Sequence, residues 1–161
     1  MTVETFKKIV WNYYRKNKRD FPWRRLPAGK AGTRDPYRIL VSEIMLQQTQ
    51  TDRVVRFYAS FLKQFPTIRA LSHAPLDRVL RSWQGLGYNR RAVMLKRLAE
   101  TVVRDFGGRI PKTPNELDRL PGIGATTAGA IAVFAFNQPT VFIETNIRRV
   151  FIHHFFPKRQ R

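Results

Sequence analysis

The chain has 161 residues, of which 30 are Lys or Arg and 11 are Asp or Glu, so its net charge is +19. Such an excess is typical of a protein whose partner is a polyanion. Nucleic acid is the first candidate partner and a membrane surface is the second. Hydrophobic residues make up 43% of the chain, which argues against a disordered polypeptide and allows one domain or two small lobes with a real core. Because the chain has no cysteine, it forms no disulfide and holds no zinc–thiolate site or iron–sulfur cluster of its own.

Residues 3–17 predict the first helix, because apolar side chains recur there at helical spacing while the other face is basic. Residues 18–34 follow as a basic loop broken by prolines and glycines, which we expect to be flexible at 28–33. Within this loop, Phe21-Pro22-Trp23-Arg24 is expected to anchor aromatic rings on the core. We interpret the remainder of the loop as a solvated linker.

The second predicted helix carries a carboxylate among apolar side chains. Asp35-Pro36 is a strong helix start, with Asp35 as the cap and Pro36 in the first turn. The apolar positions of the helix are Ile39, Leu40, Ile44 and Leu46. Glu43 lies among them, and a carboxylate in such a place must be paired, protonated or line a cavity. Glu43 is therefore a candidate functional residue.

Further helices are predicted at about 51–65, 67–72, 76–84 and 92–106, as a pair within 114–136, and finally from Thr145, which we expect to be the cap. The apolar run Val141-Phe142-Ile143 is expected to be buried, and residues 140–143 are the only piece whose helix or strand character is ambiguous. The predicted class is all-α, with about nine helices. No apolar run is long enough to cross a membrane and no signal core begins the chain, so we expect a cytoplasmic protein.

The pair within 114–136 surrounds the stretch Leu120-Pro121-Gly122-Ile123-Gly124. Thr113-Pro114 with Glu116 predicts the start of the first helix, and an Ala-rich apolar run predicts the second. Two glycines around Ile123 allow a hairpin too tight for side chains. The second helix then begins with free N–H groups that can hold a phosphate, although an ordinary helix–turn–helix corner explains Gly-x-Gly alone equally well.

These motifs together resemble the helix-hairpin-helix DNA glycosylase superfamily, in which an acidic residue follows twenty positions after Gly124, as Glu144 does here. The stretch Val41-Ser42-Glu43-Ile44-Met45-Leu46-Gln47-Gln48-Thr49-Gln50 resembles the adenine glycosylase (MutY) branch. Gly85-Leu86-Gly87-Tyr88 and Thr127-Ala128-Gly129-Ala130 resemble the same branch. The resemblance runs from about Phe21 to Val150.

The resemblance implies a two-lobed helical fold. A six-helix barrel lobe would span 21–137, with the helix-hairpin-helix at about 114–136, and residues 1–20 with 138–161 would form the second lobe. The implied activity is base-excision repair, the removal of adenine mispaired with 8-oxoguanine or guanine in double-stranded DNA. The base would be flipped out of the stack into the cleft between the lobes. A monomer associated with the nucleoid is implied.

Catalytic roles are implied for three residues. Glu43 aligns with the glutamate that protonates the leaving adenine, which is a poor leaving group as an anion. Glu144 stands where the family has an aspartate that stabilises positive charge on the sugar. Asn146 aligns with an active-site asparagine. The substitution of glutamate for aspartate at position 144 is a departure from the family, and we expect the backbone to accommodate it.

DNA contacts are implied for Gln48, which aligns with a wedge residue that enters the base stack, for Gln47 beside it, and for Tyr88, which aligns with an aromatic that intercalates next to 8-oxoguanine. Further DNA contacts are expected from Arg90, Arg91, Gly122, Gly124, Thr126, Arg148 and Arg149. The resemblance also implies a monovalent cation, Na⁺ or K⁺, on the backbone carbonyls of Asp118, Leu120 and Ile123. No other cofactor is expected to be required.

Thr126 occupies the place of the lysine of bifunctional relatives, so no Schiff base can form there and β-lyase activity is not expected. Most relatives continue into a four-cysteine cluster and a C-terminal domain. Both a shortened, cluster-free protein and a piece of a longer one are therefore compatible with the sequence. Two other functions remain open: a thymine glycosylase acting on T·G mismatches, and a DNA-binding module without catalytic activity.

Overall fold

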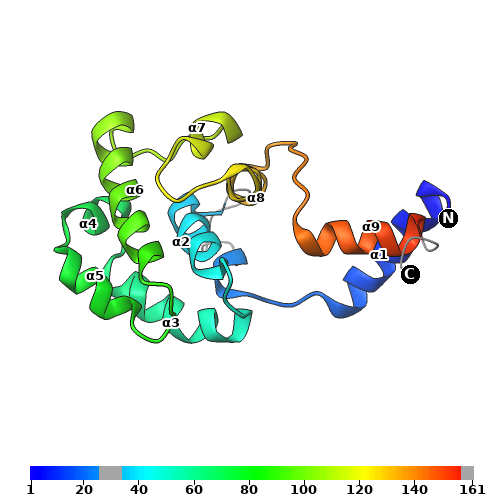
Figure 1. Ribbon diagram of the computed structural model, residues 1–161, viewed down its shortest axis with the longest axis horizontal. Coiled ribbons are helices and arrows are strands. Elements are labelled where there is room, and N and C mark those ends of the chain that lie inside the picture. Colours follow the sequence, from blue (N-terminus) through cyan, green and yellow to red (C-terminus); the bar gives the residue numbers. More distant parts are fainter. Residues whose placement is uncertain (26–33, 157–161) are drawn as a thin grey trace. The chain divides into compact units, whose positions relative to one another are not determined.

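The computed structural model describes residues 1–25 and 34–156, and in these ranges every regular element is a helix (Figure 1). The elements are α1 (Val3–Asn17), the 3-10 helix η1 (Pro22–Arg24), α2 (Pro36–Leu46), α3 (Thr51–Gln64), α4 (Ile68–His73), α5 (Leu76–Trp83), α6 (Arg90–Phe106), α7 (Pro114–Asp118), α8 (Ala125–Phe136) and α9 (Thr145–Phe155). The predicted all-α class is thus confirmed. The flexibility expected at 28–33 lies outside the described residues.

The chain divides into two compact units, one formed by Phe21–Val141 and the other by Met1–Asp20 together with Phe142–Arg161. The first unit holds η1 and the helices α2 to α8, and the second holds α1 and α9. The sequence placed the boundary at 137/138, four residues before the division at 141/142.

The helices begin where the sequence offers caps. Asp35 accepts hydrogen bonds from the backbone N–H groups of Tyr37 and Arg38, at 2.9 and 3.4 Å, so α2 starts at Pro36 as predicted. Thr113 accepts from the Glu116 N–H at the start of α7, and its hydroxyl donates to the Glu116 carboxylate at 2.6 Å. Helices α2 and α7 are therefore fixed by side-chain hydrogen bonds at their first turns.

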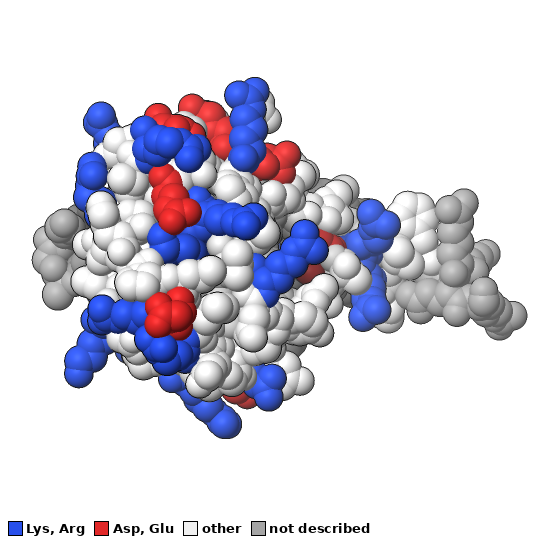
Figure 2. All heavy atoms as spheres, turned by 60° about the vertical axis from the view of Figure 1, so that its left-hand side comes forward, with Lys and Arg blue, Asp and Glu red and all other residues white. Residues whose placement is uncertain are grey.

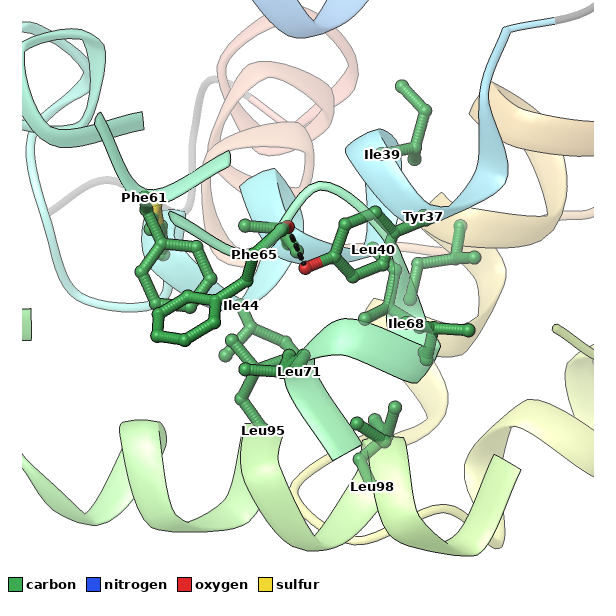
Figure 3. Close-up of a cluster of buried hydrophobic side chains, with 14 of the residues drawn as sticks. Tyr37, Ile39, Leu40, Ile44, Phe61, Phe65, Ile68, Leu71, Leu95 and Leu98 are labelled. Carbon is green, nitrogen blue, oxygen red and sulfur yellow. Dashed lines mark hydrogen bonds between the residues drawn. The ribbon is translucent and has the colours of Figure 1, made fainter. Parts of the chain in front are cut away.

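Helix α2 is the centre of the Phe21–Val141 unit. Seven of its eleven residues are buried, and it packs against α3, α6 and α8. In Figure 3 its side chains Leu40 and Ile44 meet rings and leucines from α3, α4 and α6, and the Tyr37 hydroxyl donates to the Phe65 carbonyl at 2.7 Å. The rings of Phe21 and Trp23 stack at 4.9 Å and are buried against this core, as predicted. A side chain carried by α2 is thus held on a rigid element.

The other unit is built differently. The Phe6 ring of α1 lies 5.2 and 5.1 Å from the rings of Phe151 and Phe155 of α9, but neither helix has a fully buried residue. The expected burial of the run before α9 is wrong, since Val141 is 90% exposed and Ile143 56% exposed. The cap of α9 is Glu144 rather than Thr145, because the Glu144 carboxylate accepts the Ile147 N–H at 2.9 Å.

Candidate active site

Glu43 lies on α2 between buried neighbours and is itself half-buried. Burial raises the pKa of its carboxyl from 4.5 to about 7, and the nearby Arg24 guanidinium partly opposes this shift. Arg24 is in turn held over the rings of Phe134 and Phe21, at 4.8 and 5.5 Å from their centres. A carboxyl group in this position keeps its proton at neutral pH much more often than an exposed glutamate does, which is the property of a general acid.

One helical turn after Glu43, α2 ends and the chain turns. Gln47 is the C-cap, and its side-chain amide donates to the Gly122 carbonyl at 3.2 Å and to the Thr127 hydroxyl at 3.4 Å. Gln48 follows in the left-handed conformation, with φ of 53°, and is exposed. Gln47 is thus tied to the helix-hairpin-helix, and Gln48 projects beside it.

A second turn, Gly85–Tyr88, lies beside the Gln47–Gln48 turn. Tyr88 also has a positive φ, 51°, and its side chain is 63% exposed. Tyr88 and Gln48 both line one pocket of about 790 Å³ on the Phe21–Val141 unit. The residues that line this pocket are Ile44, Gln47, Gln48, Tyr88, Arg90, Arg91, Met94, Gly122 and Thr127. Six residues predicted to contact DNA in this unit are therefore brought to one surface: Gln47, Gln48, Tyr88, Arg90, Arg91 and Gly122.

Arg91 lines the same pocket, but its guanidinium does not project freely from it. Its two terminal nitrogens donate to the carbonyls at the end of α2, to the Thr49 hydroxyl and to the carbonyls of Leu86 and Gly87. Partial burial lowers the pKa of this guanidinium. The predicted phosphate contact of Arg91 is not supported by this geometry, because both terminal nitrogens already have partners inside the protein and Nε, which has none among the described residues, is buried. Arg90, next to it, is exposed and has no such bonds among the described residues.

The two glycines of the hairpin differ in what they do. Gly122 has φ of +79°, and a Cβ there would lie 2.7 Å from the Met94 Cβ, so only glycine fits between the hairpin and α6. Gly124 is extended, with φ of −120°, and a Cβ there would meet nothing within 4 Å in the described part of the chain. The prediction that both glycines are needed for tightness is therefore right for Gly122 and wrong for Gly124. A Cβ at Gly124 would instead extend into open space beside the hairpin.

Gly124 is the N-cap of α8 and provides no side-chain cap. Within the described residues, the N–H groups of Ala125, Thr126 and Thr127 donate no hydrogen bond, and the side chain of Thr126 is exposed. The twelve-residue helix α8 thus presents unpaired donors and its positive dipole end beside the pocket.

The carbonyls proposed for a cation lie in the same hairpin. The Leu120 carbonyl accepts from the Ile123 N–H at 3.1 Å, and within the described residues no hydrogen bond ends on the carbonyls of Asp118 or Ile123. Carbonyl oxygens with free lone pairs suit a hard cation, so these residues fit the predicted group.

Glu144 and Asn146 belong to the other unit. The Glu144 carboxylate is half-buried and accepts two hydrogen bonds, one from the Ile147 N–H and one from the Asn146 side-chain amide at 3.1 Å. Asn146 is exposed, as is Arg148 two residues further along α9. Glu144 and Asn146, with Ile147 and apolar side chains of α1 and α9, line a hollow of about 340 Å³ in this unit.

Charge is spread widely over the molecule. Figure 2 shows Lys and Arg side chains over one face of the Phe21–Val141 unit, with Asp and Glu between them. Arg81 pairs with Asp77 at 2.5 Å, and Arg104 pairs with Asp105 at 2.7 Å. Exposed pairs of this kind add little to stability. The excess of cations, with a net charge of +19, suits long-range attraction of a polyanion.

Sequence reasoning missed three contributors. Thr127 and Met94 help to form the pocket, and Arg24 acts on Glu43 although nineteen residues separate them. Thr127 was visible in the motif, but its bond to Gln47 joins residues 80 positions apart. Such partners follow only from the packing of α2, α6 and α8.

Comparison with known proteins places this geometry in a family. Residues 41–161 match the HhH-GPD superfamily base excision DNA repair protein model. The chain is 39% identical over 156 residues to the adenine DNA glycosylase of Buchnera aphidicola subsp. Baizongia pistaciae, covering 96% of this chain and 42% of that protein. It is 41% identical over 150 residues to the adenine DNA glycosylase of Homo sapiens, covering 92% of this chain and 28% of that protein. The solved structure of a thermostable thymine-DNA glycosylase matches with a TM-score of 0.83 and 32% identity, over 92% of this chain and 65% of that one.

The chain belongs to the HhH-GPD superfamily of base excision DNA repair proteins. The predicted resemblance and the predicted helical glycosylase fold are both confirmed. The chain spans less than half the length of the curated relatives described above. In the ranges 1–25 and 34–156, no helix has the length and apolar character needed to span a bilayer.

Proposed function

We propose that this chain is the glycosylase part of a base-excision-repair enzyme that removes adenine mispaired with 8-oxoguanine or guanine. The observation that carries the proposal is the arrangement on α2. A carboxyl with a pKa of about 7, Glu43, lies one helical turn before Gln47 and Gln48, which line the pocket that also holds Tyr88 and the hairpin. The curated relatives that bear the name adenine DNA glycosylase support the choice of base.

In this mechanism Glu43 is the general acid. The bond between C1′ of the sugar and N9 of adenine breaks, its electron pair leaves with the adenine, and the Glu43 proton neutralises the leaving base. The Glu144 carboxylate stabilises the positive charge that develops on the sugar, and Asn146 holds that carboxylate through its side-chain amide. Water then adds to C1′, and its proton passes to the carboxylate that has lost one.

The hydrolysis would be monofunctional. Thr126 stands exposed in the first turn of α8 and has no amine with which to form a Schiff base. Borohydride should therefore trap no covalent complex between protein and DNA, and Thr126→Ala should keep base release. An efficient covalent adduct would refute the monofunctional assignment.

DNA would be held by two kinds of contact. The free N–H groups at the start of α8 suit a phosphate, and the open space at Gly124 lets that phosphate approach the backbone. Arg90, Arg148 and Arg149 are exposed and suit further phosphates. A monovalent cation on the carbonyls of the hairpin would add positive charge near the phosphate bound at the start of α8. We expect the protein to act as a monomer on the DNA of the nucleoid, with affinity that falls by about 0.9 log unit per contact for each log unit of salt.

A second candidate is removal of thymine from T·G mismatches. The observation that favours it is the match to the thymine-DNA glycosylase structure at 32% identity. Gln47, Gln48 and Tyr88, together with the names of the curated relatives, favour adenine.

The experiment that tests the proposed function is single-turnover base release from matched duplexes that differ at one pair: A·8-oxoguanine, A·G, T·G and C·G. We expect release of adenine from the first two and no release from C·G. Faster release of thymine from T·G would establish the second candidate. Binding of all four duplexes without any release, at any excess of protein, would identify a DNA-binding module without activity.

A further inference from the structure

Two turns of the Phe21–Val141 unit each hold a residue in a conformation that side chains rarely adopt. Gln48 has φ of 53° and Tyr88 has φ of 51°, and neither is glycine. Backbone strain of this kind is unfavourable and persists only where the surroundings fix it. Both residues line the same pocket. Something in the structure must therefore hold the two turns.

The Arg91 guanidinium lies between these turns. Its Nη1 donates to the carbonyls of Ile44 and Met45, at 3.2 and 2.8 Å, and to the Gln47 carbonyl. Its Nη2 donates to the Thr49 hydroxyl at 2.9 Å. These acceptors all belong to the end of α2 and the turn that follows it, so one part of the guanidinium closes the last turn of α2, where a cation also complements the helix dipole.

The same Nη2 reaches the other turn. It donates to the carbonyls of Leu86 and Gly87, at 3.2 and 3.0 Å, immediately before Tyr88. The guanidinium carbon also lies 5.3 Å from the centre of the Tyr88 ring and 5.6 Å from that of Trp83. One planar group thus bonds to two turns that are about forty residues apart in the sequence.

Only an arginine can make this set of bonds. A guanidinium presents its donors in a rigid planar fork, whereas the ammonium of lysine is a single point with three donors. A lysine at position 91 keeps the charge but can serve one turn at a time. A methionine keeps the approximate length and apolar stem and serves neither turn.

We propose that Arg91 is a positioning residue that joins the Gln47–Gln48 turn and the Gly85–Tyr88 turn into one preformed wedge, which enters the base stack as a unit. This inference rests on the proposed function only in that the wedge acts on a DNA duplex. Arg91 itself contacts no phosphate. Without it, the two strained turns relax separately, and DNA must reorder them at each binding event.

The test compares Arg91→Lys and Arg91→Met with Arg97→Met, a matched control. Arg97 lies on the same helix α6, is exposed and lines a different hollow. The probe is a duplex with 8-oxoguanine opposite 2′-fluoro-2′-deoxyadenosine, whose glycosidic bond resists cleavage, and with 2-aminopurine next to the 8-oxoguanine. The fluorescence of 2-aminopurine rises when a wedge unstacks it, so the readout does not depend on catalysis.

We expect the wild type and Arg97→Met to give the same rise in fluorescence at saturation, and both Arg91 variants to give less than about half of it. The slope of log affinity against log salt should stay the same in Arg91→Met. Loss of a phosphate contact would instead reduce this slope by about 0.9, and such a reduction would overturn the proposal. In Arg91→Lys, a full rise would also overturn it, because charge alone would then suffice.

Thermal unfolding of each variant, compared with that of the wild type, checks whether the variant is folded. If Arg91→Met does not fold, Arg91→Lys and Thr49→Val carry the test, since Thr49→Val removes one acceptor of Nη2 and should give an intermediate rise. The proposed function fails separately, if the wild type unstacks the probe but releases no base from any natural mismatch. A wild type that binds the probe without any rise in fluorescence would overturn the wedge itself.

Discussion

The two glutamates proposed for catalysis lie in regions of opposite character. Glu43 is on α2, the most buried helix of the Phe21–Val141 unit, where the removal of water raises its pKa to about 7. Glu144 begins α9, in a unit whose two helices have no fully buried residue, and its carboxylate accepts the Ile147 N–H and the Asn146 amide. The same residue type thus has a raised pKa and holds its proton more tightly in one region, and accepts hydrogen bonds in the other.

The two proposed roles therefore follow from the surroundings of each carboxyl rather than from the residue type. A carboxyl among apolar side chains can deliver a proton at neutral pH, whereas one that faces backbone N–H groups serves as a fixed negative charge. The first role needs a rigid, well-packed helix, and the second needs only a helix terminus. Substitutions that remove the proton of Glu43 or the charge of Glu144 should therefore affect catalysis and stability differently.

The largest effect is expected for Glu43→Gln. The amide has nearly the same shape but cannot deliver a proton, so single-turnover release of adenine should fall by about 10² to 10⁴. Affinity for the mismatched duplex, measured by fluorescence anisotropy, should stay within a few-fold of the wild type. Glu4→Gln is the control, because Glu4 is exposed and, within the described ranges, forms an ion pair with Lys7 alone. A variant that releases adenine almost as fast as the wild type would move the acid role away from Glu43, with Glu144 as the next candidate.

The next effect concerns the charge of Glu144. Glu144→Gln should lower the single-turnover rate by about 10², which is typical for loss of one preorganised electrostatic group. Glu144→Asp keeps the charge but falls one carbon–carbon bond short, so its loss should be smaller. A tenfold faster reaction in Glu144→Asp would show that the natural residue is a defect. Unchanged rates in both variants would show that this glutamate only begins the helix.

Most of the fold could be predicted from the sequence because its signals are local. Asp35-Pro36 and Thr113-Pro114 mark helix starts through their own hydrogen bonds, and α1 has the bounds 3–17 that its apolar period indicates. Helix α9 begins one residue earlier than a cap at Thr145 would allow, because Glu144 is the cap. The exposure of Val141 was not predicted, because apolar composition alone does not say whether a neighbouring element covers a segment.

The candidate site could be predicted only in part. Its members could be named from motifs, and Gln47, Gln48, Tyr88 and Gly122 do line one pocket. The hydrogen-bond partners of a long side chain could not be named from motifs. Arg91 looks like any exposed arginine in the sequence, and its partners appear only when α2, α6 and the Gly85–Tyr88 turn are packed together. The different needs of Gly122 and Gly124 were hidden for the same reason.

A smaller effect is expected on stability as a function of pH. The folded-state pKa of Glu43 is raised from 4.5 to about 7, so the folded protein binds this proton more tightly than the unfolded chain does. The tighter binding of the Glu43 proton contributes fully to the stability of the fold below pH 4.5, and this contribution is lost as the pH rises to about 7. Glu43→Gln cannot lose a proton. Because Glu43 is only half-buried, we expect the variant to gain about 1–3 kcal/mol over the wild type at pH 8 relative to pH 4.5.

The measurement is urea unfolding followed by the fluorescence of the buried Trp23 and Trp83, at pH 4.5 and pH 8. Differences between variant and wild type remove the pH effects that both proteins share. Glu4→Gln should show no such gain. An equal difference at both pH values would mean that Glu43 titrates as an ordinary glutamate.

The smallest effect should be confined to α9. Glu144→Ala removes the acceptor of the Ile147 N–H, and loss of an N-cap costs about 0.5–2 kcal/mol. Hydrogen exchange at the Ile147 amide should become faster by a corresponding factor, while the Ala128 amide, which bonds to the Gly124 carbonyl at 2.9 Å, should keep its rate. Glu144→Asp should preserve protection at Ile147, since aspartate is a strong N-cap. This variant then separates the two uses of the carboxylate: a slow reaction with a protected Ile147 amide assigns the loss to catalysis, and a slow reaction with an unprotected one assigns it to the start of the helix.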